Sequence, residues 1–341
     1  MDWQIDLTGD VPIYKQIVSS IEIGALNGSL QPRTQLPSMN VLAADLGISK
    51  ETVKKAYGVL VGKGIIVPMH GKGFFVADPM SRTQRRVLVL FDKFSVYKQV
   101  LFNAFAAELG PSSEIGILCH NQSVDLLEHY LDVNLDRFDW YVVTPHFPLD
   151  PETQKRVIKQ LRRIPNRKLI LLDRLQPGMS GHFGTVYQDF ENDIYDGLTQ
   201  IWSEESPSRM LRVITLPTSL YGATIRRGIE RFCADRQRPV EFLTAAPDDI
   251  RQRDTFLVLN SQLDAGLVDL ARNIRKSGLT IGQDVRIISY NEYEMNELIL
   301  GGLTTVSADF PEMGRLAAGM ILSRQPAQIH CPFRLTRRST F

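Results

Sequence analysis

The sequence is poor in cysteine and has almost no net charge. Its three cysteines, Cys119, Cys233 and Cys331, are far apart and form no Cys-x-x-Cys pair. Such scattered cysteines are typical of a reducing compartment and argue against a disulfide framework or a cysteine-based metal site. With 39 Lys and Arg against 38 Asp and Glu, the net charge is +1. Any surface that binds nucleic acid must therefore be local.

Long apolar runs and catalytic motifs are also missing. No apolar run approaches the roughly 18 residues of a membrane span, and residues 1–6 lack the basic and apolar regions of a signal peptide. We therefore expect a cytoplasmic protein with no membrane partner. The six histidines show no metal-binding spacing, and Gly-x-Ser-x-Gly and P-loop motifs are absent. We expect no enzyme activity, no metal and no cofactor.

The 341 residues, of which 43% are hydrophobic, are enough for roughly two globular domains. Short helical patterns fill residues 1–77, and the polar, basic segment 78–86 is interpreted as a linker. From residue 87 to 341 apolar strands alternate with helical stretches, which predicts parallel sheets covered on both faces. This region is too long for one ordinary sheet, so we expect two α/β lobes. The predicted strands are 87–91, 115–118, 140–143, 169–172, 211–214, 255–259 and 285–288.

Residues 38–62 have the pattern of two helices joined by a tight turn. Ser38 is a candidate N-cap for a helix that ends at Gly47, and Ser49 is a candidate N-cap for the next helix. In that second helix four apolar residues share one face, namely Val53, Ala56, Tyr57 and Leu60. The pattern predicts a helix-turn-helix, in which the second helix enters the major groove of DNA.

A β-wing is predicted after these helices. Two apolar strands within residues 64–76 flank the segment His70-Gly71-Lys72-Gly73, whose glycines permit close approach to another backbone. From Lys50 to Lys72 the chain has five lysines and one acidic residue. Phosphate contacts from these lysines would make DNA binding sensitive to salt.

Four stretches, 12–17, 35–38, 42–56 and 71–76, resemble the winged helix-turn-helix of GntR-family transcription regulators. The resemblance covers residues 11–76 and implies DNA contacts from the start of the recognition helix and from the wing. The candidate DNA-binding residues are Ser38, Asn40, Ser49, Lys50, Thr52, Lys54, His70, Gly71 and Lys72. The family usually has Arg where Asn40, Lys50 and Lys54 stand, so base preference is expected to differ, because Lys lacks the bidentate grip of Arg on guanine.

The stretches 278–292, 303–306, 309–318 and 337–339 resemble the effector domain of LacI/GalR-type regulators. That resemblance spans residues 86–341 and implies a two-lobed α/β fold of the periplasmic-binding-protein type (type I). The predicted architecture is therefore α/β, with a DNA-binding domain at 1–77, a linker at 78–86, and an effector-binding and dimerisation domain at 87–341.

Polar residues follow several predicted strands, where ligands bind in open α/β sheets. Asp173, Asn260 and Asn291 have this placement, and aromatic residues near them are able to stack on a sugar face. Together with the family resemblance, this gives the candidate ligand-binding residues Phe94, Thr144, Asp173, Arg226, Asn260, Asn291 and Phe310. The family often has Asp where Asn291 stands, and often has an effector-binding Arg where Ile225 stands. Either Arg226 takes over that role or the ligand lacks the contact.

The expected function is a ligand-responsive transcription regulator or repressor. It would bind double-stranded, palindromic operator DNA as a homodimer and would sense a small molecule, a carbohydrate or its derivative, between its lobes. Three alternatives remain open at this point. The large domain could be an enzyme, such as an aminotransferase-like domain with pyridoxal phosphate; it could sense another metabolite, such as a purine; or it could only transport or scavenge sugar.

Overall fold

The chain forms two compact units, Met1–Arg85 and Arg86–Phe341. The structure is a computed structural model, and it describes residues 5–6, 11–69, 71–77, 85–202, 210–215, 219–259 and 265–341. Most of the predicted linker, residues 78–84, lies outside the described residues, as do the candidates His70 and Asn260. Within the described ranges, no helix is both long and apolar enough to cross a membrane.

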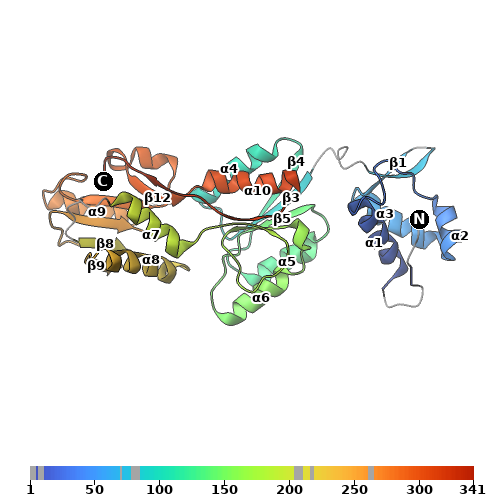
Figure 1. Ribbon diagram of the computed structural model, residues 1–341, viewed down its shortest axis with the longest axis horizontal. Coiled ribbons are helices and arrows are strands. Elements are labelled where there is room, and N and C mark those ends of the chain that lie inside the picture. Colours follow the sequence, from blue (N-terminus) through green and yellow to red (C-terminus); the bar gives the residue numbers. More distant parts are fainter. Residues whose placement is uncertain are drawn as a thin grey trace. The chain divides into compact units, whose positions relative to one another are not determined.

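The N-terminal unit has three helices and a two-stranded wing (Figure 1). The helices are α1 (Ile13–Leu26), α2 (Met39–Leu46) and α3 (Lys50–Gly62). The wing consists of β1 (Ile66–Met69) and β2 (Gly73–Val76), which pair antiparallel. This is the predicted winged helix-turn-helix.

Local signals in the sequence explain where these helices begin and end. The Ser38 hydroxyl accepts a hydrogen bond from the Val41 amide at 3.3 Å, and the Ser49 hydroxyl accepts one from the Thr52 amide at 3.2 Å. Gly47 ends α2 in the left-handed conformation, with φ of 64°. Both predicted N-caps and the predicted glycine stop are confirmed, since these groups satisfy the free ends of the helices.

The apolar face of α3 supplies the centre of the small core. Its predicted residues Val53, Ala56, Tyr57 and Leu60 are all buried. They join a cluster that also holds residues of α1 and α2, such as Ile17, Ile21 and Leu42. Because this face is fully used for packing, the opposite face of α3 is the one left to solvent.

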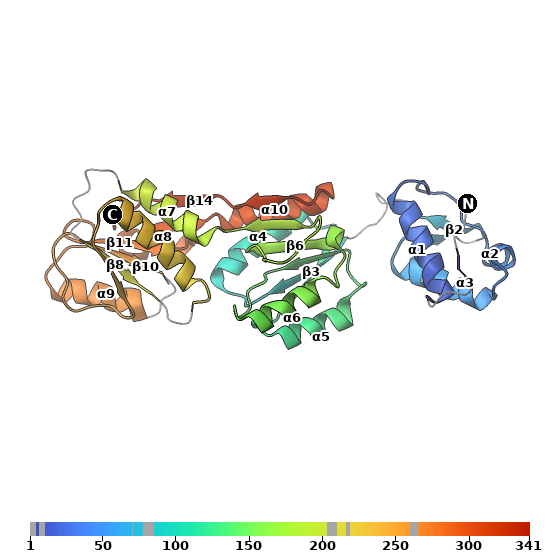
Figure 2. The same cartoon turned by 60° about the horizontal axis from the view of Figure 1, so that its bottom comes forward.

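In the second unit, the first lobe is a six-stranded sheet with helices on both faces (Figure 2). The sheet order is β13-β7-β6-β5-β3-β4, and β13, β7, β6, β5 and β3 run parallel. Helices α4 (Val96–Leu109) and α10 (Phe310–Ser323) pack side by side on one face, while α5 (Val124–Asn134) and α6 (Pro151–Leu161) cover the other. The strands are β3 (Arg85–Phe91), β4 (Ser113–Cys119), β5 (Trp140–Val143), β6 (Leu169–Asp173), β7 (Gly184–Tyr187) and β13 (Gln328–His330).

The second lobe repeats this layered plan. Its sheet order is β14-β12-β11-β10-β8-β9, with only the β12–β14 pair antiparallel among its described pairs. Helices α7 (Phe190–Ile201) and α8 (Gly222–Asp235) cover one face and α9 (Ala265–Lys276) the other. The strands are β8 (Met210–Ile214), β9 (Val240–Leu243), β10 (Asp254–Val258), β11 (Arg286–Tyr290), β12 (Thr304–Ala308) and β14 (Phe333–Thr336).

The predicted two-lobed α/β fold is confirmed, and each of the seven predicted strands is present to within a few residues. The strands β7, β9, β12, β13 and β14 were not among the predicted ones. They have three to five residues each, and β9, β13 and β14 lie at sheet edges.

Three short connections join the two lobes, at residues 188–189, 309 and 331–332. Backbone hydrogen bonds hold these connections together. The Asp309 amide donates to the Pro332 carbonyl at 2.8 Å, and the Cys331 amide donates to the Tyr187 carbonyl at 2.8 Å. The chain therefore crosses between the lobes through one bonded strip, which restricts how they can move relative to one another.

Helices α4 and α10 approach closely because of one glycine. A Cβ atom on Gly314 would lie 2.3 Å from the Leu101 carbonyl oxygen and 2.9 Å from the Phe105 amide nitrogen. Both neighbours are backbone atoms and cannot move aside alone. Gly319, on the same helix, has no atom within 4 Å of its Cβ position.

We expect Gly314→Ala to lower the free energy of unfolding of the second unit by about 1–3 kcal/mol, the usual effect of overpacking. Gly319→Ala is the matched control, and it should leave stability unchanged or raise it by up to about 1 kcal/mol, because alanine is the better helix former. Urea unfolding of both variants checks this. Equal stability of the two would contradict the close packing of α4 on α10.

Candidate ligand site and nucleic-acid interface

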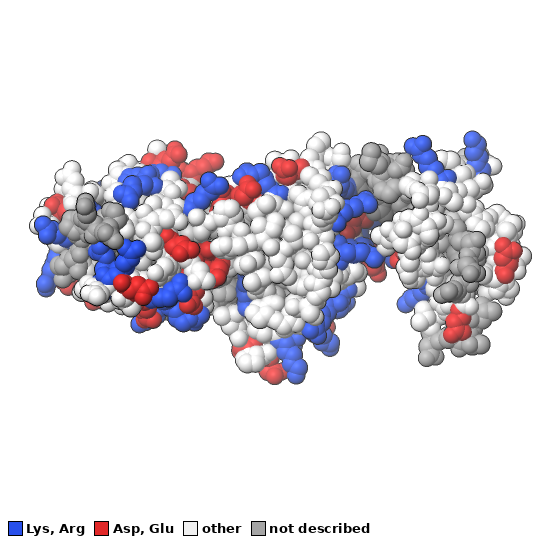
Figure 3. All heavy atoms as spheres, in the orientation of Figure 1, with Lys and Arg blue, Asp and Glu red and all other residues white. Residues whose placement is uncertain are grey.

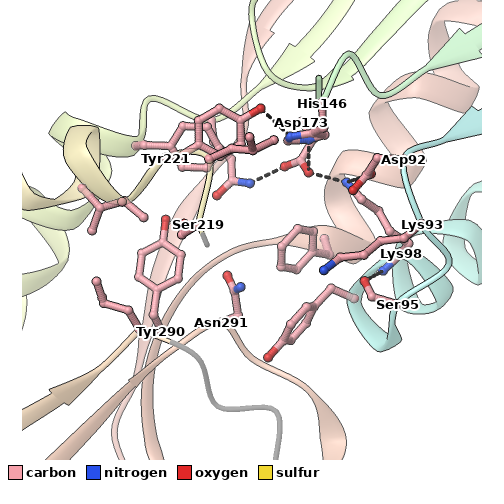
Figure 4. Close-up of a pocket in the computed structure, with 18 of the residues that line it drawn as sticks. Asp92, Lys93, Ser95, Lys98, His146, Asp173, Ser219, Tyr221, Tyr290 and Asn291 are labelled. Carbon is pink, nitrogen blue, oxygen red and sulfur yellow. Dashed lines mark hydrogen bonds and ion pairs between the residues drawn. The ribbon is translucent and has the colours of Figure 1, made fainter. Parts of the chain in front are cut away.

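A pocket of about 280 Å³ opens between the two lobes of the second unit (Figure 4). Its polar residues lie at the carboxyl ends of parallel strands, as is usual for ligand sites in α/β folds. From the first lobe, Asp92 follows β3, Asp173 ends β6 and Gln188 follows β7. From the second lobe, Thr215 follows β8 and Asn291 follows β11.

The centre of the site is the carboxylate of Asp173, which is 6% exposed. It accepts hydrogen bonds from the Lys98 ammonium, from His146 Nε2 at 2.8 Å and from the Gln188 amide. Burial raises the pKa of Asp173, but the charge of Lys98 and the contact with His146 outweigh it and hold the pKa well below its usual range. Asp173 is therefore ionised at neutral pH.

A second buried carboxylate, Asp92, lies beside the same ammonium group. Lys98 Nζ is 3.8 Å from Asp92 Oδ1, and the Thr144 hydroxyl donates to that oxygen at 3.1 Å. The Asp92 amide in turn donates to the Thr144 hydroxyl at 2.8 Å. One buried lysine thus serves two buried carboxylates.

A hydrogen bond between His146 and Tyr221 crosses between the lobes at the pocket. Because ionised Asp173 only accepts, His146 Nε2 is the donor of their hydrogen bond. The Tyr221 hydroxyl, from the start of α8, lies within hydrogen-bond distance of His146 Nδ1, at 2.5 Å. Figure 4 shows the row of Tyr221, His146, Asp173 and Lys98 along one side of the pocket. Tyr221 thereby ties the second lobe to the charged centre of the first.

Aromatic pairs form apolar parts of the wall. Phe190 and Tyr221 stack with ring centroids 4.3 Å apart, and Tyr97 stacks on Phe310 at 5.5 Å. All four residues line the pocket. Flat apolar surfaces beside polar groups suit a ring-shaped ligand that carries hydrogen-bonding substituents.

Two residues at strand ends share an uncommon backbone conformation. Asp173 has φ of 75° and Asn291 has φ of 76°, a region that residues other than glycine rarely adopt. They face the pocket from opposite lobes, and Figure 4 shows Asn291 pointing into it from the side away from His146. Asp173 caps no helix, so its place at the strand end serves the pocket and not a helix N-terminus.

The other ligand candidates have different surroundings. Phe310 lines the pocket, whereas Thr144 is buried and is not among the lining residues, and its hydroxyl donates to Asp92. Phe94 and Arg226 are not among the lining residues. Phe94 is 47% exposed, and the Arg226 guanidinium pairs with Glu230 at 2.7 Å on the outside of α8.

Asp92, Lys98 and His146 are among the lining residues that the sequence did not single out. A signal exists for one of them. Lys98 lies in the buried stripe of α4 with Leu101 and Phe105, where a charged residue requires a partner. His146 lies in a loop after β5, and no local pattern marks it.

In the N-terminal unit, the candidates for DNA contact gather at the starts of α2 and α3 and in the wing. Ser49, Lys50 and Lys54 are exposed, and Thr52 is half-buried with its hydroxyl 2.8 Å from that of Ser49. Ser38 and Asn40 are both exposed at the start of α2. In the wing, Gly71 has φ of 71°, and Lys72 is exposed, its carbonyl accepting from the Gln35 amide at 2.7 Å.

The basic residues of α8 are poorly suited to bind DNA in addition to the winged domain. Arg227 pairs with Glu191 at 2.8 Å, as Arg226 does with Glu230. Over the lobe that holds α8 and α9, Figure 3 shows Lys and Arg atoms interspersed with Asp and Glu atoms. Such pairs neutralise one another and leave little field for phosphates.

Comparisons with known proteins match the two units separately. Residues 13–76 match the model of bacterial regulatory proteins of the gntR family, and residues 212–341 match the periplasmic binding protein-like domain. The repressor NagR of Bacillus subtilis is 39% identical over 75 residues, which cover 22% of this chain and 31% of that protein. The match thus spans about a third of the length of that relative.

Two further likenesses extend over the larger unit. The arabinose metabolism transcriptional repressor of Halalkalibacterium halodurans is 23% identical and aligns over 91% of this chain and 88% of its own length. The solved trehalose repressor of Escherichia coli covers 74% of this chain and 99% of its own, with a TM-score of 0.59 and 16% identity, which supports the fold.

These findings define the class: a domain of the bacterial regulatory gntR family is joined to an α/β domain of the periplasmic-binding-protein-like type. More particularly, residues 13–76 form a domain of the GntR type, and the second unit shares its fold with a solved regulatory protein of the LacI family from Chloroflexus aggregans, which is 16% identical with a TM-score of 0.58. The aminotransferase-like alternative is inconsistent with this fold of the second unit.

We expect Lys98→Met to lower the free energy of unfolding of the second unit by about 3–5 kcal/mol, because two buried carboxylates then lose their only buried ammonium partner among the described residues. Adding Asp173→Asn should restore part of this loss. The exposed Lys159→Met is the control and should change stability by less than about 0.5 kcal/mol. Urea unfolding tests the prediction, and wild-type stability of Lys98→Met would show that the carboxylates are not ionised there.

Proposed function

We propose that this protein is a ligand-responsive repressor that binds double-stranded operator DNA through its winged domain and senses a sugar or sugar derivative between its lobes. The observation that carries the proposal is the pocket, which takes polar groups and aromatic faces from both lobes. A ligand that contacts both lobes changes the free energy of their closure, and through the chain that of DNA binding.

The DNA contacts proposed for the winged domain follow from exposure and charge. The lysines at the start of α3 stand at the N-terminus of that helix, where the helix dipole favours phosphate. Lys54 is 64% exposed in its side chain, and its ion pair with Glu51 at 3.5 Å is exposed and easily exchanged for phosphate. A homodimer on a palindromic site would double these contacts. We place this activity in the cytoplasm.

We expect Lys54→Ala to weaken operator binding and to lower the slope of log affinity against log salt by roughly 0.9 for each phosphate that a subunit no longer neutralises. Lys276→Ala is the control, because it removes the same charge from an exposed position on α9 in the other unit. Fluorescence anisotropy over a salt series measures both. An unchanged slope for Lys54→Ala would remove this residue from the interface.

The case for a sugar combines chemistry and likeness. Carboxylate, amide and ammonium groups of the pocket match hydroxyls, and its stacked aromatic pairs match the faces of a sugar ring. A relative that aligns over nearly the whole chain is named for arabinose metabolism. A purine also has flat faces and polar edges, so nucleobases belong in the same screen.

We expect one member of a panel of pentoses, hexoses, sugar phosphates and nucleobases to raise the melting temperature of the second unit. At about 100 times its Kd the gain is roughly 2.7 kcal/mol, or several degrees. Asn291→Ala should abolish the shift, while Asn103→Ala, on the exposed side of α4, should keep it. A ligand that shifts Asn291→Ala as strongly as the wild type binds elsewhere.

A further inference from the structure

Gln188 lies at the first connection between the lobes, directly after β7, and it lines the pocket. It is 7% exposed. Its side-chain Nε2 donates to Oδ1 of Asp173. Since ionised Asp173 accepts but cannot donate, rotating the amide would set two oxygens against each other. The orientation of the Gln188 amide is therefore fixed by its charged neighbour.

The other end of the same amide is unmatched. No donor among the described residues reaches Gln188 Oε1, although the atom is buried. A buried acceptor without a donor is unfavourable, so the site gains when a bound molecule supplies an N–H or O–H group. Asn291 Oδ1, from the second lobe, is likewise buried without a donor among these residues. No contact among the described residues fixes the orientation of its amide, so Asn291 does not by itself require a donor from the ligand.

The buried charges of the pocket disfavour an anion. Two carboxylates, Asp92 and Asp173, are buried at the floor of the pocket with a single ammonium group, that of Lys98. The floor of the pocket therefore holds more carboxylates than ammonium groups. Lys93 is exposed and extends toward the middle of the pocket (Figure 4), where solvent screens its charge.

We propose that Gln188 determines specificity by accepting a hydrogen bond from a hydroxyl of the ligand, and that the effector is an uncharged, hydroxyl-rich molecule. Phosphorylated and carboxylated forms of the same molecule are excluded, because they bring acceptors and negative charge where the pocket already holds both. This rests on the proposed function, since it assigns the ligand of the same pocket.

The first experiment compares charge forms of one scaffold by calorimetry on the full chain. The probes are arabinose, ribose and glucose, with ribose 5-phosphate, glucose 6-phosphate, gluconate and glucosamine. A neutral sugar should bind at least about tenfold more tightly than its phosphate or acid. Tighter binding of an anionic form, or of glucosamine through its ammonium group, overturns the proposal but leaves the proposed function intact. Binding by none of the probes overturns the sugar-sensing function and this proposal with it.

The second experiment tests the residue. Gln188→Met keeps the size of the side chain but lacks both amide groups, and it should weaken binding of the neutral sugar about tenfold. Gln176→Met is the matched control, because Gln176 is also a buried glutamine with an unmatched Oε1 but does not line the pocket. The control should bind like the wild type. Wild-type affinity of Gln188→Met overturns the proposal.

Monodeoxy analogues of the same sugar separate recognition from a merely structural effect, and they require only the wild-type protein if the variant fails to fold. For the wild type, one analogue should bind about tenfold more weakly than the parent sugar. For Gln188→Met, the same analogue should bind as tightly as the parent sugar. If every analogue loses equally in both proteins, Gln188 only shapes the pocket and the proposal is overturned. If every analogue binds the wild type as tightly as the parent sugar does, the pocket recognises no single hydroxyl and the proposal is wrong.

Discussion

The buried carboxylate of Asp173 determines the arrangement of the groups around the pocket. A single ionised acceptor binds the ammonium of Lys98, Nε2 of His146 and the amide of Gln188. Two of these then present a defined atom to a further neighbour: Lys98 to Asp92, and His146 to Tyr221. Since the pKa of Asp173 is held low by these same partners, the network and its charge state support one another.

How much the sequence could predict depends on how local the determining interaction is. In the N-terminal unit Ser38, Gly47 and Ser49 act on residues within one turn, so the helices could be located from the sequence alone. Asp173 and Asn291 could also be placed, because each lies where a strand ends. His146 could not, because its role depends on Asp173 and Tyr221, which are 27 and 75 residues away along the chain.

The differences among the ligand candidates have the same origin. Arg226 and Ile225 are adjacent in sequence, but α8 turns Ile225 into the pocket and Arg226 outward to Glu230. Thr144 follows a strand as expected, yet its hydroxyl is used within the first lobe by Asp92. Spacing along the chain identifies the right end of the sheet, whereas the direction of a side chain is decided by helix phase and by the partners available.

The hydrogen bond between His146 and Tyr221 limits how far a ligand can shift the equilibrium of lobe closure. It joins the lobes through protein groups alone, so the protein itself contributes to closure. A ligand then shifts the equilibrium only by the additional contacts that it makes in one arrangement and not in the other. A ligand contact to a single lobe raises the affinity but does not shift the equilibrium of lobe closure. Gln188 is well placed for such a difference, because it lies on a connection between the lobes and its position relative to the second lobe depends on how they close.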